Sequence, residues 1–152
     1  MGVGWCGLTR VHQLRREEQR TQDQAEAVIS LSTEQGFPFW LAEGFMFRGW
    51  ALAVQGRGAA GLSELRRGLD AYQATGTEAW RSHMLALLAE AYGKDAQVEN
   101  GLRTVAEGLA FIERTQERYY EAELYRLKGE LLLQKAREQP TGTGKSKIKS
   151  QK

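Results

Sequence analysis

Apolar residues recur at helical spacing from about residue 17 to residue 135, and strand-like alternation is absent from the sequence. Ala25, Val28 and Ile29 form one such stripe, which Gly36 ends. Pro38 suits the first turn of the next helix, because its missing N–H would have no intrahelical partner there. The pattern predicts an all-α protein. The expected helices cover residues 17–35, 38–55, 59–74, 77–92 with Thr77 as N-cap, 98–114 and 119–135.

Residues of one type return every 40 positions along the chain, as Trp40, Trp80 and Tyr120 do. The other residues in register are Gly49, Ala89 and Gly129; Leu52, Tyr92 and Leu132; Gly61 and Gly101; Leu65 and Val105; and Gly68 and Gly108. A repeat of this length is typical of stacked helical hairpins, which usually present a binding surface. The repeat therefore predicts a scaffold without naming its ligand.

Several of the recurring residues are glycines inside expected helices, where each glycine costs up to about 1 kcal/mol relative to alanine. We interpret them as places where a neighbouring helix approaches closely. The positions are Gly49, Gly61, Gly68, Gly101, Gly108 and Gly129.

The order of large, small and aromatic residues resembles the tetratricopeptide repeat. The residues that carry the resemblance are Phe45, Gly49, Leu52, Gly61, Leu65 and Gly68, and then Leu85, Ala89, Tyr92, Gly101, Val105 and Gly108. The period of 40 residues is longer than the usual one of about 34, and glycine stands where alanine is common. The resemblance implies a right-handed α-solenoid of helical hairpins.

Four segments are also similar to a narrower group, the C-terminal helical repeats of large bacterial proteins that join a nucleotide cyclase or another signalling domain to a regulatory ATPase. These segments cover residues 34–42, 48–52, 85–93 and 120–133. The cyclase and ATPase motifs of that family lie far upstream of its repeats and do not occur in this chain. The resemblance therefore implies a regulatory or sensing segment and transfers no catalytic residue.

The sequence divides into a poorly ordered N-terminus at 1–9, a helical repeat domain at 10–136 and a disordered basic tail at 137–152. The net charge of +2 comes from Lys145, Lys147, Lys149 and Lys152 in the last eight residues. Without them, 17 basic residues face 19 acidic ones. We therefore expect no specific nucleic-acid binding, which requires a basic face on a folded element.

Cys6 is the only cysteine, so no intrachain disulfide can form. The first residues lack the charged and apolar regions of a secretory signal, and no apolar run is long enough to span a bilayer. We expect a cytoplasmic protein that does not bind membranes.

The one enzyme-like string is Gly144-Lys145-Ser146, which matches the end of a phosphate-binding loop and leaves a nucleotide-binding protein as the alternative function. The loop should begin with glycine at position 139, where this chain has Gln139. His12 and His83 are not spaced as metal ligands. We expect no catalytic residue, metal or cofactor.

By the resemblance, the first helix of each hairpin lines a concave surface. The inner-face positions are Glu43, Met46 and Trp50 in the first copy; His83, Ala86 and Glu90 in the second; and Glu123, Arg126 and Glu130 in the third. Acidic groups beside an apolar spot suit a protein or peptide partner with basic and apolar side chains. The alternative is that these residues belong to the core or to a solvated face.

The last expected helix has no following partner helix in the sequence. Its leucines are Leu124, Leu127, Leu131 and Leu132. Because a repeat unit buries its apolar face against its neighbour, we expect self-association through this uncapped C-terminal repeat.

Overall fold

The computed structural model describes residues 2–139, which form seven α-helices, one 3₁₀ turn and no strand. The all-α prediction is confirmed. The elements are α1 (Gly2–Leu14), α2 (Glu18–Gln35), α3 (Pro38–Val54), α4 (Gly58–Ala74), α5 (Arg81–Lys94), α6 (Val98–Thr115), the 3₁₀ turn η1 (Arg118–Tyr120) and α7 (Glu121–Glu138).

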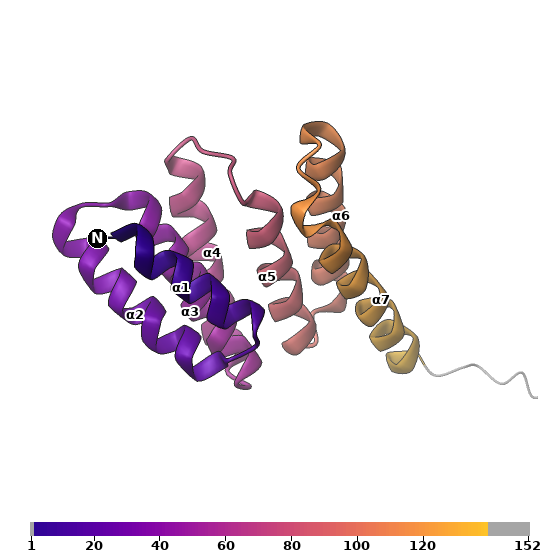
Figure 1. The fold of residues 1–152 in the computed structure, drawn as a ribbon. Helices are drawn as coiled ribbons and strands as arrows, with labels where there is room; N and C mark the ends of the chain where they lie inside the picture. The colour runs from indigo at the N-terminus through magenta and orange to yellow at the C-terminus, as the bar shows by residue number, and fades with distance from the viewer. Residues whose placement is uncertain (1, 140–152) are drawn as a thin grey trace, which may run out of the picture.

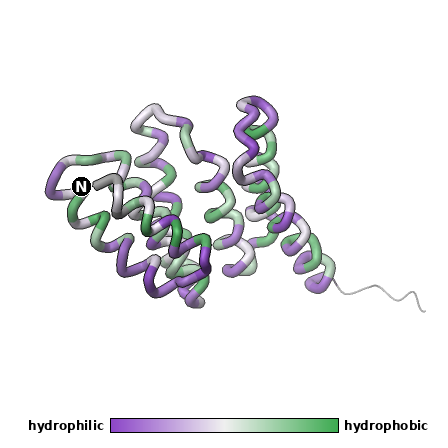
Figure 2. The backbone as a smooth tube through the Cα atoms, viewed as in Figure 1, coloured by the Kyte–Doolittle hydropathy of each residue, from purple (hydrophilic) through white to green (hydrophobic). Residues whose placement is uncertain are grey.

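The helices pack in chain order, as the colour gradient of Figure 1 shows. Helix α3 contacts both α2 and α4, and α6 contacts both α5 and α7. Helices α3, α5 and α7 also touch in succession, and α1 lies on α2 and α3. Hydrophilic and hydrophobic turns are interleaved along the helices in Figure 2, as expected where one face of each helix is buried.

Two predicted boundaries at the N-terminal side of helices are wrong. The segment 1–9 was expected to be poorly ordered, but α1 begins at Gly2. Its buried side chains include Cys6, Thr9 and Gln13, a largely polar face that an apolar stripe does not reveal. Helix α5 begins at Arg81, because the backbone of Trp80 before it is left-handed, with φ of 64°. The Thr77 hydroxyl accepts a hydrogen bond from the Ala79 N–H within the preceding turn.

Helix α7 continues to Glu138, so residues 137 and 138, expected in the disordered tail, are helical. The rest of that tail, residues 140–152, lies outside the described residues.

The core consists of two adjoining clusters. One centres on Trp50, Leu65 and Tyr72, where α3 and α4 meet α5. The other joins Val105 and Ile112 of α6 to the inward face of α7. Of the four leucines expected to leave an apolar surface partly exposed, Leu124, Leu127 and Leu131 of α7 are buried, whereas Leu132 is 47% exposed.

Close helix approach at the glycines is clearest where α3 crosses α4. A Cβ atom on Gly61 would lie 2.6 Å from the carbonyl oxygen of Gly49, and one on Gly49 would lie 2.8 Å from that of Gly61. Side chains similarly occupy the space beside Gly68, Gly101 and Gly108. The packing interpretation is confirmed at these positions. Gly129 differs, since no atom lies within 4 Å of a Cβ placed there.

Candidate partner-binding cleft

The predicted groove positions of the first two copies are not on the surface. Glu43, Met46 and Trp50 are each 1% exposed. His83, Ala86 and Glu90 are also buried. These residues therefore do not form a free groove. Residues of α1 and the following turn contact Glu43, His83 and Glu90, while Met46 packs beside Gly68 of α4 and Ala86 lies in the core.

Three polar side chains from this N-terminal segment reach the covered residues. Arg10 forms an ion pair with the buried Glu43 carboxylate, and its guanidinium lies 4.1 Å from the centroid of the Trp80 ring. Gln13 Oε1 lies 3.0 Å from His83 Nε2, and Arg16 pairs with Glu90. The buried charges of the groove positions are therefore matched by α1 and its turn.

His83 lies at the centre of this covered region. Its ring stacks on Tyr120 at a centroid distance of 4.2 Å, and Phe47 meets it edge-on at 5.7 Å. Burial, with a smaller contribution from the positive charge of Arg10, lowers the pKa of His83 to about 3. His83 is therefore neutral at physiological pH and serves packing.

Glu43 and Cys6 are also adapted to burial. Burial raises the pKa of the Glu43 carboxyl group, although the neighbouring Arg10 opposes the shift. Burial raises the pKa of the Cys6 thiol to about 12, and the Glu43 charge adds to this. A thiol held in its protonated form is a poor nucleophile, so Cys6 is not a reactive cysteine.

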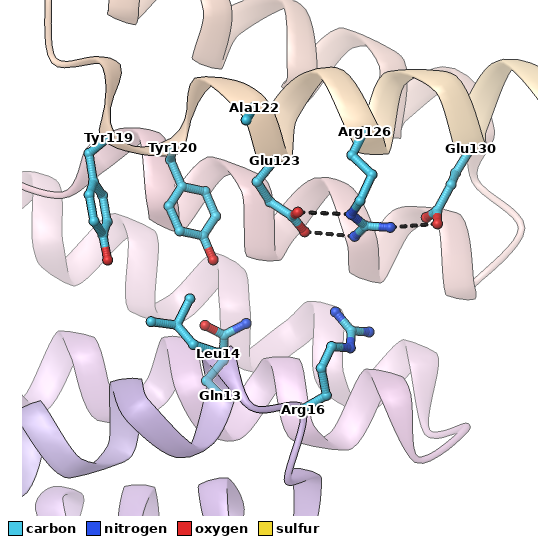
Figure 3. A pocket seen from close by; sticks show the side chains of 9 residues that line it. All are labelled: Gln13, Leu14, Arg16, Tyr119, Tyr120, Ala122, Glu123, Arg126 and Glu130. Atoms are coloured by element: carbon cyan, nitrogen blue, oxygen red, sulfur yellow. Dashed lines mark hydrogen bonds and ion pairs between the residues drawn. The ribbon is translucent and has the colours of Figure 1, made fainter.

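The groove positions of the third copy line an open cleft, seen in Figure 3, between the end of α1 and α7. Its volume is about 660 Å³. In Figure 3, Tyr119 and Tyr120 point toward Gln13 and Leu14, while Arg16 points toward Arg126. The lining residues are Gln13, Leu14, Arg16, Tyr119, Tyr120, Ala122, Glu123, Arg126 and Glu130.

One end of the cleft is acidic. Arg126 donates two hydrogen bonds to the Glu123 carboxylate, at 2.8 and 2.6 Å, and a third to Glu130. The hydrogen bond that Arg126 donates to Glu123 is the main reason that the pKa of Arg126 is raised. Arg16 also lines the cleft, but its charge is paired with Glu90. The wall formed by α7 has two glutamates and one arginine, and so carries an excess of one negative charge.

The other end is apolar and aromatic. Leu14 is 48% exposed and Tyr119 is 54% exposed, whereas Tyr120 is buried between Tyr119 and His83. Sequence reasoning placed Glu123, Arg126 and Glu130 in the groove but missed Leu14, Arg16 and Tyr119. No signal in the repeat assigns Leu14 or Arg16, because both come from the segment that was expected to precede the first hairpin.

Metal binding and nucleotide binding are the other kinds of chemistry considered from the sequence. Between residues 2 and 139, no group of three or more His, Cys, Asp or Glu side chains could hold a metal ion. His12 instead pairs with Glu17. Gly144, Lys145 and Ser146 lie outside the described residues.

No helix in the described part of the chain has the length and hydropathy needed to cross a membrane.

Comparison with protein-family models, with curated proteins and with solved structures found no match for this chain. Its function must therefore be inferred from its own residues.

Proposed function

We propose that this protein is a non-enzymatic, cytoplasmic scaffold of tetratricopeptide-like hairpins that binds a short segment of a protein partner between α1 and α7. The observation that carries the proposal is that Glu123, Arg126 and Glu130 are the groove positions that α1 leaves uncovered. They stand beside exposed apolar side chains in a cleft large enough for several ligand side chains.

The positions of the turns support a solenoid with a period of 40 residues. Residues with a left-handed backbone form two sets, and the members of each set are 40 positions apart. The first set is Arg16, Gly56 and Ala96, and the second is Gly36, Gly76 and Gln116. Helices begin at Glu18, Gly58 and Val98, and again at Arg81 and Glu121. In this arrangement α1 belongs to the same series as α3, α5 and α7, which explains why it faces the groove.

The chemistry of the cleft favours a segment with a basic and an apolar side chain. A lysine or arginine of the partner would share the carboxylates of Glu123 and Glu130 with Arg126. An apolar neighbour would pack on Leu14 and Tyr119. Because Arg126 is 43% exposed, its own ion pairs are screened by water and rearrange at little cost.

A regulatory setting is favoured by the similarity of four segments to the repeats of bacterial cyclase and ATPase signalling proteins. In such a setting the scaffold recognises a partner and performs no chemistry. The proposal therefore assigns no role to a cofactor.

Selection from a phage-displayed library of short linear peptides tests this function. We expect recovered peptides to combine lysine or arginine with a large apolar residue. The double variant Glu123→Gln with Glu130→Gln should lose this binding, because Arg126 then makes the cleft positive. Glu113→Gln, an exposed change on α6 outside the cleft, is the matched control and should bind normally. Peptides without basic residues, or equal binding by the double variant, would reject the proposal.

A further inference from the structure

Helix α7 has a second exposed face, distinct from its cleft side and its buried side. Tyr125, Leu132 and Leu133 on this face are 56%, 47% and 60% exposed. Gly129 lies between them, and the space beside it is open. A solvent-facing helix surface that carries three large apolar residues around a glycine is unusual.

The corresponding positions of α3 and α5 are covered by a neighbouring helix. In α5, Leu85 and Ala89 are fully buried, and the Ala89 carbonyl oxygen lies 3.3 Å from a Cβ placed on Gly101 of α6. In α3, Phe45 is buried and Gly49 meets Gly61 of α4. The face of α7 thus has the composition of a helix-packing surface without a helix on it.

We propose that this face binds the same face of a second copy of the chain, with the two α7 helices antiparallel and a two-fold axis near Gly129. The Gly49–Gly61 contact shows that two helices of this protein cross closely where glycine meets glycine. A Gly129 pair at the axis would repeat that crossing and bring Tyr125 against Leu132 of the partner subunit.

Charge favours the antiparallel direction. Glu121 lies in the first turn of α7 and Arg137 in its last turn, while Glu123 and Lys135 are paired with Arg126 and Glu99 away from this face. An antiparallel pair therefore places acidic first turns beside basic last turns, whereas a parallel pair would place like charges together. Residues 140–152 contain one apolar residue, Ile148, so their sequence offers no apolar stripe to cover this face.

Sedimentation velocity of the full chain tests the surface. The unmodified chain should dimerise at micromolar concentration, and Gly129→Gln should be monomeric because its side chain blocks the crossing. The variant should still fold, since the space beside Gly129 is open in the monomer and glutamine favours helix more than glycine does. Val11→Gln removes a comparably exposed apolar residue from α1 and should leave the dimer intact. A monomeric unmodified chain, or a Gly129→Gln chain that dimerises equally well, would overturn the proposal.

Disulfide trapping tests the direction of the pair. A mixture of Tyr125→Cys and Leu132→Cys chains should form a mixed disulfide dimer under mild oxidation, while each variant alone should crosslink poorly. Cys6 is buried and should not interfere. Efficient crosslinking of Tyr125→Cys alone would indicate a parallel pair and contradict the proposed geometry. The cleft variants Glu123→Gln and Glu130→Gln should leave dimerisation unchanged, so this surface is tested independently of partner binding.

Discussion

The indole N–H of Trp50 donates a hydrogen bond of 2.8 Å to the Glu90 carboxylate. The two residues lie on α3 and α5, and both are buried. Arg16, from the turn after α1, pairs with the same carboxylate and lies 5.4 Å from the centroid of the Trp50 ring. Two residues expected in an open groove are therefore joined to each other and covered by the N-terminal segment.

Replacing Trp50 with phenylalanine should reduce the free energy of unfolding by about 1–3 kcal/mol, because the buried Glu90 carboxylate loses a hydrogen-bond donor. Urea unfolding followed by circular dichroism measures the change. Trp40→Phe, at a partly exposed position, is the matched control and should have a smaller effect. Equal midpoints for both variants would mean that this hydrogen bond does not stabilise the fold.

Stability should fall in mild acid because of His83. The unfolded chain binds a proton at His83 below a pH of about 6.5, whereas the folded protein does so only near pH 3. The unfolded state is thus favoured increasingly as the pH falls through this range. Between pH 6.5 and 5, His83 should contribute a loss of about 2 kcal/mol.

The variant His83→Gln isolates this contribution, because carboxyl groups titrate in both proteins. We expect the unmodified protein to be more stable at neutral pH and the gap between the two to narrow toward pH 5. A constant gap in urea midpoints would show that His83 is not buried in its neutral form.

Truncation of a fully buried core leucine should be far more damaging than truncation of an exposed one. Leu85→Ala in α5 should cost about 2–5 kcal/mol, because it leaves a cavity where α5 packs on its neighbours. Leu133→Ala is the same chemical change on the exposed face of α7 and should be close to neutral in the monomer. Similar losses in thermal unfolding would contradict this assignment of buried and exposed faces.

We expect no hydrolysis of ATP or GTP by the pure protein. Gln139 stands where a phosphate-binding loop begins with glycine, so Lys145 lacks the loop that would place it against a phosphate. A phosphate-release assay on the unmodified chain and on Lys145→Ala decides the point. Turnover that disappears in Lys145→Ala would favour the nucleotide-binding alternative over the scaffold.

Local signals in the sequence identified most helices, but they did not show which other elements pack on each helix. Pro38 and Val98 begin helices as expected. Thr77 resembles an N-cap, but it lies in a turn held by the Tyr72 hydroxyl, which donates to the Ala79 carbonyl oxygen. This hydrogen bond joins α4 to the turn before α5, and the position of that turn beside α4 depends on tertiary packing. No local sequence pattern therefore predicts it.

For a similar reason, the sequence did not show that the predicted groove positions are buried in the first two copies and line an open cleft only in the third. The repeat spacing identifies which residues of α3, α5 and α7 share a face, including Glu43, Glu90 and Glu123. It carries no information about α1, whose contacts to that face come from Arg10 and Gln13 instead of an apolar stripe. Only tertiary structure shows that α1 closes part of the face and leaves the cleft beside α7.

The most direct test of partner binding in this cleft is a backbone amide NMR titration of the ¹⁵N-labelled chain with a selected basic, apolar peptide. The largest shift changes should fall at Leu14, Arg16, Tyr119, Glu123, Arg126 and Glu130. Changes confined to other surfaces, such as the outward side of α4 or the Tyr125 face of α7, would contradict the account.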